Sequence, residues 1–142
     1  MNRLPPLITA AILATGLGPL PAEAAGFTTA AEVKPILTAT RANWVAVREY
    51  EGQDLLYFTQ IESWRCGLSE VRYGLNGTPA DQVRIMEPCY EDEAAPNAIK
   101  AEGHLPFITL PLGSVESVTI ELIYDDATSD SATFAREAVQ IP

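Results

Sequence analysis

Few side chains in this sequence are of the types that catalyse reactions. His104 is the only histidine, and a catalytic histidine needs a nucleophile or an activated water within reach and a group that orients its ring. The Gly-x-Ser-x-Gly turn of many hydrolases is missing, because Ser114 is followed by Val115-Glu116. We therefore expect His104 on the surface or at a strand end. A small periplasmic hydrolase that uses His104 with a carboxylate is the alternative.

The acidic residues could form two further kinds of site. Asp125, Asp126 and Asp130 lie close together in a predicted turn, and clustered oxygen ligands suit calcium. Their spacing does not follow the pattern of calcium-binding loops, and aspartate is a common turn residue. No pair among the acids is singled out as the acid and base of a glycosidase. We interpret these aspartates as turn residues and expect no metal ion, cofactor or catalytic residue.

The two cysteines, Cys66 and Cys89, are the remaining reactive side chains. Their spacing is not that of a C-x-x-C redox motif, and one histidine cannot complete a zinc site with them. An even pair in an oxidising compartment is typical of a disulfide. We predict a structural Cys66–Cys89 bridge.

The first 24 residues carry the features of a cleavable signal peptide. Arg3 supplies a positive charge, residues 4–20 contain no charged residue, and residues 7–14 form a short apolar run. Ala22 and Ala24 give the small-x-small pattern of a cleavage site, with cleavage after Ala24 or, as the next choice, after Ala25. A membrane anchor is the competing interpretation, but a spanning helix needs about 20 apolar residues. We expect residues 25–142 to form one β-rich domain that is periplasmic or secreted, without membrane insertion after cleavage.

The net charge of −10 limits the choice of partner. Removing residues 1–24 takes away one basic and one acidic residue, so the balance does not change. Nucleic acid and anionic lipid both require basic surfaces, and we expect neither as a partner. Another envelope protein is the partner class that remains open.

The hydrophobic pattern predicts one helix followed by strands. Apolar residues recur at helical spacing up to Thr40, and Pro35 suits the first turn of a helix over 34–42. The Thr29-x-x-Glu32 capping box offers a rival start. From Asn43 onward the pattern alternates with period two, and turn residues separate the segments. The predicted strands cover residues 44–50, 55–61, 64–73, 82–86, 104–110, 115–124 and 129–135.

Six or seven short strands separated by turns are typical of a small antiparallel β-sandwich or open barrel. If Tyr73 faces Gln82 across the 74–81 loop, the same antiparallel register places Cys66 opposite Cys89, and a register shifted by two would serve nearly as well. Val118, Ile120, Leu122 and Tyr124 should point inward.

Core packing explains the aromatic residues of these strands, but a sheet face that exposed several of them would be a ligand or partner surface. The residues concerned are Trp44, Tyr50, Tyr57, Phe58, Trp64 and Tyr73.

Five short segments carry a resemblance to other proteins: residues 35–37, 53–58, 63–68, 96–99 and 111–118. On these segments, the stretch 34–142 resembles a small uncharacterised family of exported, periplasmic bacterial proteins of unknown function. The resemblance implies export and no particular activity. The sequence therefore favours a non-enzymatic binding or protein-interaction domain, with an accessory subunit of a cell-envelope assembly as a further alternative.

Overall fold

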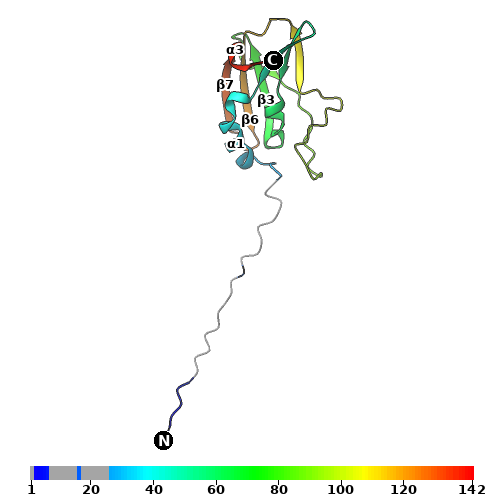
Figure 1. Ribbon diagram of the computed structural model, residues 1–142. Coiled ribbons are helices and arrows are strands. Elements are labelled where there is room, and N and C mark those ends of the chain that lie inside the picture. Colours follow the sequence, from blue (N-terminus) through cyan, green and yellow to red (C-terminus); the bar gives the residue numbers. More distant parts are fainter. Residues whose placement is uncertain (1, 7–15, 17–25) are drawn as a thin grey trace.

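The computed structural model describes residues 2–6, 16 and 26–142 (Figure 1). The predicted signal peptide and its cleavage site lie almost entirely outside the described residues. Within these residues, no helix has the length and apolar character needed to cross a membrane.

The domain opens with helix α1 (Ala30–Ala39), which starts earlier than predicted. Thr29 caps it: the Thr29 side chain accepts a hydrogen bond from the Glu32 backbone N–H and donates one to the Glu32 carboxylate. The capping box therefore sets the start of the helix, and the predicted start at Pro35 is wrong. Pro35 lies inside the helix, on its exposed side, where water is available to the carbonyl that loses its N–H partner.

Eight strands form two four-stranded sheets, which confirms the predicted β-sandwich with a short N-terminal helix. Sheet A has the order β5 (Phe107–Pro111), β2 (Gln53–Tyr57), β1 (Ala46–Tyr50) and β8 (Gln140–Ile141). Sheet B has the order β4 (Gln82–Val83), β3 (Leu68–Leu75), β6 (Ser117–Tyr124) and β7 (Ser129–Ala135). All strand pairs are antiparallel except β1 with β8.

The core lies between the two sheets and is closed by α1. Strand β6 alternates as predicted, with Val118, Ile120, Leu122 and Tyr124 all buried. Sheet A, sheet B and α1 all contribute to one cluster of buried residues, which includes Val33, Leu37, Trp44, Val47, Leu56, Phe58, Val71 and Phe134. Residues 26–142 therefore share a single core.

Two of the predicted strands are partly wrong. Residues 59–61, assigned to the second strand, lie in helix α2 (Thr59–Glu62), and residues 65–67, assigned to the third, lie in the 3-10 helix η3 (Arg65–Gly67). These turns bring Arg65 into the interior, where its guanidinium donates to the backbone carbonyls of Glu62, Pro88, Asn97 and Ala98. Such long-range hydrogen bonds override the local alternation, because a buried guanidinium must have its donors satisfied.

The predicted Cys66–Cys89 disulfide is present, with 5.1 Å between the Cα atoms. The expected register is also observed, since Tyr73 pairs with Gln82. The ladder stops at Val83, however, three residues short of the predicted strand end, so neither cysteine lies in a strand. Cys66 lies in η3 and Cys89 in the segment that follows β4.

Three further elements complete the chain. The 3-10 helix η2 (Arg41–Asn43) joins α1 to β1, and helix α3 (Arg136–Val139) leads from β7 into β8. Neither α3 nor β8 has a sequence prediction. The strand predicted over 104–110 corresponds to β5, which lies at an edge of sheet A. The segment between β4 and β5 runs along one side of the domain (Figure 1).

Candidate binding face

The outer face of sheet A is apolar and aromatic. Strand pairing sets side by side, in one row, Ala46 of β1, Tyr57 of β2 and Phe107 of β5. Because side chains alternate along a strand, this row shares its face with the residues two and four positions away. We call this surface the aromatic face; its residues are Ala46, Arg48, Tyr50, Gln53, Leu55, Tyr57, Phe107, Thr109, Pro111 and Ile141.

Leu55 lies at the centre of the aromatic face and is only 6% exposed, yet it is not part of the core between the sheets. Tyr57 and Phe107 contact each other with their ring centroids 5.2 Å apart. Tyr50 and Ile141, at the margin, are exposed. None of the residues of the aromatic face belongs to the core cluster or to the hydrophobic residues packed against it, so the face lies outside the core between the sheets.

The outer face of sheet B has the opposite character. Its paired rows consist mainly of serine, threonine, glutamate and arginine residues: Glu70, Arg72, Ser117, Thr119, Glu121, Ser129, Ser131 and Thr133. The other residues on this face are Gly74, Val83, Ile123 and Ala135. Such a polar face is the usual solvated side of an antiparallel sheet. The difference between the two sheets shows that the apolar character of the aromatic face is a local property of sheet A.

Arg48 is the only charged residue on the aromatic face, although the chain has 19 acidic residues. Its guanidinium carbon lies 4.7 Å from the centroid of the Tyr50 ring. Each of the other lysines and arginines within residues 26–142 makes an ion pair or hydrogen bonds. Arg48 alone in this part of the chain makes neither, so its donors face solvent.

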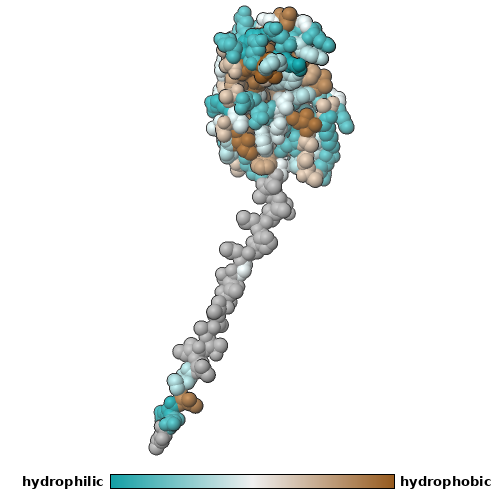
Figure 2. All heavy atoms as spheres, in the orientation of Figure 1, coloured by the Kyte–Doolittle hydropathy of each residue, from teal (hydrophilic) through white to brown (hydrophobic). Residues whose placement is uncertain are grey.

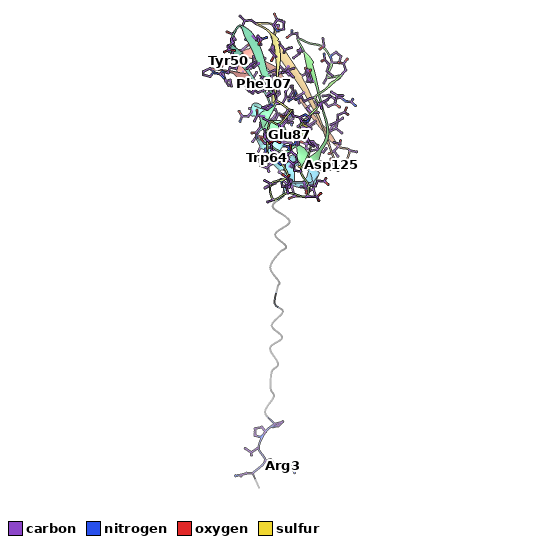
Figure 3. All side chains as sticks on the ribbon, turned by 90° about the vertical axis from the view of Figure 1, so that its right-hand side faces the viewer. Arg3, Tyr50, Trp64, Glu87, Phe107 and Asp125 are labelled. Atoms are coloured by element: carbon purple, nitrogen blue, oxygen red, sulfur yellow. A yellow bond between two sulfur atoms is a disulfide. The ribbon has the colours of Figure 1, made fainter. Side chains whose placement is uncertain are left out.

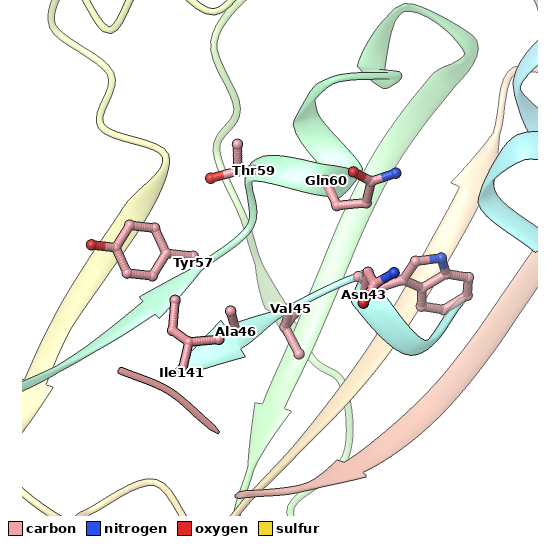
Figure 4. A pocket seen from close by; sticks show the side chains of 8 residues that line it. Asn43, Val45, Ala46, Tyr57, Thr59, Gln60 and Ile141 are labelled. Atoms are coloured by element: carbon pink, nitrogen blue, oxygen red, sulfur yellow. The ribbon is translucent and has the colours of Figure 1, made fainter. Parts of the chain in front are cut away.

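A pocket of about 270 Å³ adjoins the aromatic face (Figure 4). Ala46, Tyr57 and Ile141 belong to both the pocket and the face, while Thr59 and Gln60 from α2 supply polar groups at its rim. Figure 4 shows the Tyr57 ring and Ile141 on one side of the hollow and the Gln60 amide on the other. The face and this pocket together offer an apolar area that borders a recess.

The aromatic face lies away from the acidic turn. Figure 3 places Tyr50 and Phe107 toward one end of the domain and Asp125 and Trp64 toward the other. On the side shown in Figure 2, hydrophobic residues form separate patches among hydrophilic ones.

Two of the aspartates considered for calcium are held by basic side chains. Asp130 accepts two hydrogen bonds from Arg41 at 2.8 and 2.9 Å, and Asp126 pairs with Lys34 at 3.1 Å. Hydrogen bonds from Thr128 and Lys34 lower the pKa of Asp126 to about 2. Partial burial, together with neighbouring acidic groups, raises the pKa of Asp125. Among the described residues, no group of three potential ligands is placed to hold a metal ion.

His104 is half-buried in the segment before β5. Within the described chain, no hydrogen bond or ion pair joins its ring to a carboxylate or hydroxyl. The structure thus does not assemble the histidine–carboxylate pair that the hydrolase alternative needs.

Sequence reasoning missed two buried ionic clusters. Asp54, expected in a turn, is fully buried in β2 and accepts hydrogen bonds from Arg136 and from the backbone N–H groups of Gly113 and Val115. Although burial opposes ionisation, the hydrogen bonds from Arg136 dominate and hold the pKa of Asp54 well below its usual range. This cluster joins β2 to α3 and to the turn before β6, and so supports sheet A.

The second cluster surrounds Arg65. Burial raises the pKa of Glu62 despite its ion pair with Arg84, which lies 2.9 Å away. Burial also opposes ionisation of Glu87, but hydrogen bonds from the Tyr90 hydroxyl and the Lys100 backbone N–H outweigh it and lower the Glu87 pKa. The Glu87 carboxylate in turn raises the pKa of Tyr90 to about 12. Every charge here has a partner within the chain, which is typical of a structural network.

The structure divides the aromatic residues of the strands between the core and the outer face of sheet A. Trp44 and Phe58 belong to the core, and Trp64 and Tyr73 pack against it. Tyr50 and Tyr57 instead lie on the aromatic face. Alternation could have identified Tyr50: Val45 and Val47 define the inward positions of β1, so Tyr50 falls on the outer side. Residues 55–58 are apolar or aromatic at every position, so the same signal does not separate Tyr57 from Phe58.

Comparison with known proteins gave no match to a family model, a curated protein or a solved structure. The class of this protein is therefore defined by its fold alone: a two-sheet β-sandwich with one disulfide.

Proposed function

We propose that this protein is a non-enzymatic protein-interaction domain that binds its partner through the aromatic face. One observation carries the proposal: a sheet face rich in aromatic residues, with one arginine and no acid, lies outside the core and exposes Tyr50 and Ile141. Exposed apolar surface of this kind is typical of interaction sites.

The composition of the face supports a protein partner. The centres of protein–protein interfaces are enriched in tyrosine, phenylalanine and arginine and depleted in lysine, aspartate and glutamate. The aromatic face has Tyr50, Tyr57, Phe107 and Arg48 and none of the depleted charged residues. A periplasmic or secreted location is part of the proposal; the leader pattern and the disulfide support it. Another envelope protein is the partner that this location makes available.

Affinity capture from the envelope fraction tests this function. The purified protein should capture a partner that the Tyr57→Ser/Phe107→Ser double variant does not capture. Thr133→Ala, a change on the outer face of sheet B, should capture it as well as the unchanged protein does. Circular dichroism must show that both variants are folded.

Hydrogen exchange on the captured complex locates the contact. We expect protection over β1, β2 and β5. A partner protected elsewhere, or captured equally by the double variant, would refute the aromatic face as the binding surface.

A further inference from the structure

We infer that the partner presents a carboxylate to Arg48, on an extended segment whose neighbouring apolar side chain enters the pocket beside Tyr57. This inference rests on the proposed function and specifies the chemistry of the partner. It names one kind of occupant: an acidic-apolar peptide segment of another protein.

The first argument is charge. Arg48 is the single basic side chain within residues 26–142 without an ion pair or hydrogen bond, in a chain of net charge −10. Its neighbours on the face, Leu55 and Ile141, are apolar, and Tyr50 lies against its guanidinium. A carboxylate bound here accepts two hydrogen bonds from the Arg48 guanidinium beside apolar side chains. Such bidentate arginine–carboxylate pairs are strong where water is partly excluded.

The second argument is spacing. Ala46, at the pocket, and Arg48 are two positions apart on β1, a distance of about 7 Å along a strand. Residues i and i+2 of an extended segment have the same separation and point to the same side. An acidic residue two positions from an apolar one therefore matches Arg48 and the pocket together.

The third argument is size. Four strands of up to five residues make a face of roughly 15 Å by 15 Å, from the usual strand spacing and rise. A standard interface buries about 800 Å² on each partner, which is well beyond this area. A short segment of the partner fits the face better than a broad surface does.

A second copy of this chain is a poorer occupant. Two aromatic faces packed on each other would leave both Arg48 side chains without an acidic partner, because neither face has an acidic residue. Neutral sugars would leave the Arg48 charge unpaired.

The test is a selection from a displayed library of random twelve-residue peptides. Peptides are selected on the purified protein after subtraction on the Tyr57→Ser/Phe107→Ser variant, and the best binder is synthesised for affinity measurement. We expect an aspartate or glutamate two positions from an aromatic or aliphatic residue. Changing that acid to its amide should weaken binding at least tenfold.

Arg48→Gln should weaken binding of the unchanged peptide by a similar factor. The matched control is Arg72→Gln, which removes an exposed arginine from the outer face of sheet B and should leave affinity unchanged. The Arg48→Glu variant should bind a peptide in which lysine replaces the acid.

The other outcomes separate the two proposals. Peptides that need Tyr57 and Phe107 but neither an acid nor Arg48 would overturn this inference and leave the proposed function standing. If no selected peptide distinguishes the protein from the double variant, both are overturned. Two results would show that the aromatic face binds something else and would overturn both proposals. One is a concentration-dependent dimer that the double variant does not form, and the other is a neutral glycan that binds the face.

Discussion

Replacing Asp54 with asparagine tests the ionic cluster that supports sheet A. The Asp54 carboxylate is fully buried and accepts four hydrogen bonds, two from Arg136 at 2.6 and 3.0 Å and two from backbone N–H groups at 3.0 and 3.1 Å. The asparagine has the same shape but lacks the charge, and its amide group places donors against donors. Breaking a buried ion pair in this way costs about 3–5 kcal/mol.

We expect a loss near 3 kcal/mol, the lower end of that range, because Arg136 keeps its contact with Glu49. Small domains have total stabilities of about 5–15 kcal/mol, so the change should be large in urea unfolding at pH 7. Glu49→Gln is the matched control: it neutralises the other carboxylate paired with Arg136, but this side chain is 51% exposed. An exposed pair contributes about 0–1 kcal/mol, and the control should lose no more than that.

The stability difference should also depend on pH. The folded-state pKa of Asp54 lies below its unfolded value of about 3.9, so its ionised form is favoured by folding. The stabilisation is therefore fully present above about pH 5 and is lost as pH falls below about 4. The difference in unfolding free energy between the unchanged protein and Asp54→Asn should therefore narrow as pH falls below about 4. A gap under 1 kcal/mol at pH 7, or one that grows as pH falls, would contradict this account.

Two further predictions concern the packing around η3. Replacing both Cys66 and Cys89 with alanine should cost about 3 kcal/mol in denaturant unfolding, because the bridge closes a loop over a sequence separation of 23. In the unchanged protein, unfolded without reductant, alkylation should label neither cysteine. Two labelled thiols would refute the bridge. Gly67→Ala should cost about 2–3 kcal/mol in the same assay, since its methyl group would collide with Val33, while Gly103→Ala, where the methyl meets open space at a positive φ, should cost only about 1 kcal/mol. Equal losses at the two glycines would contradict the close packing of η3 on α1.

The sequence was sufficient to predict the parts of the fold that depend on local alternation. Strand β6 has an uninterrupted period of two. The hairpin between β1 and β2 was also expected, but with a turn over residues 51–54, whereas the structure turns at Glu51 and Gly52, which both have positive φ. Such a two-residue turn fixes the register of its strands without help from distant residues. The Tyr73–Gln82 register and the disulfide were predictable for a similar reason, because a short connection limits the possible pairings.

The parts that were mispredicted depend on distant residues. Arg65 leaves the strand pattern because its hydrogen-bond acceptors include carbonyls at Pro88 and Ala98, which no local pattern reveals. Asp54 resembles a turn residue until Arg136, far along the chain, is placed beside it. Strand β8 has two residues and pairs in parallel with β1, so it leaves no periodic signal.

The aromatic face shows why the candidate site could be only partly predicted. Alternation tells which residues share a side of a strand, but it cannot tell which side another element will cover. Tyr57 and Phe58 are adjacent aromatic residues; Phe58 is fully buried in the core, whereas Tyr57 lies on the opposite face. Only the packing of the second sheet distinguishes them.

The placement of charge in the molecule favours a binding role for this face over a purely structural one. A small domain gains stability by burying apolar groups between its sheets, and Leu56 and Val47 already do this for the inner side of sheet A. The outer row of Tyr57 and Phe107 adds little to that core, because both residues lie outside it. Exposed aromatic residues also promote aggregation, a cost that a net charge of −10 offsets through repulsion between copies. Since the acidic residues within residues 26–142 are all placed off the aromatic face, the face keeps both its apolar character and the unpaired charge of Arg48, the two properties that a partner segment would use.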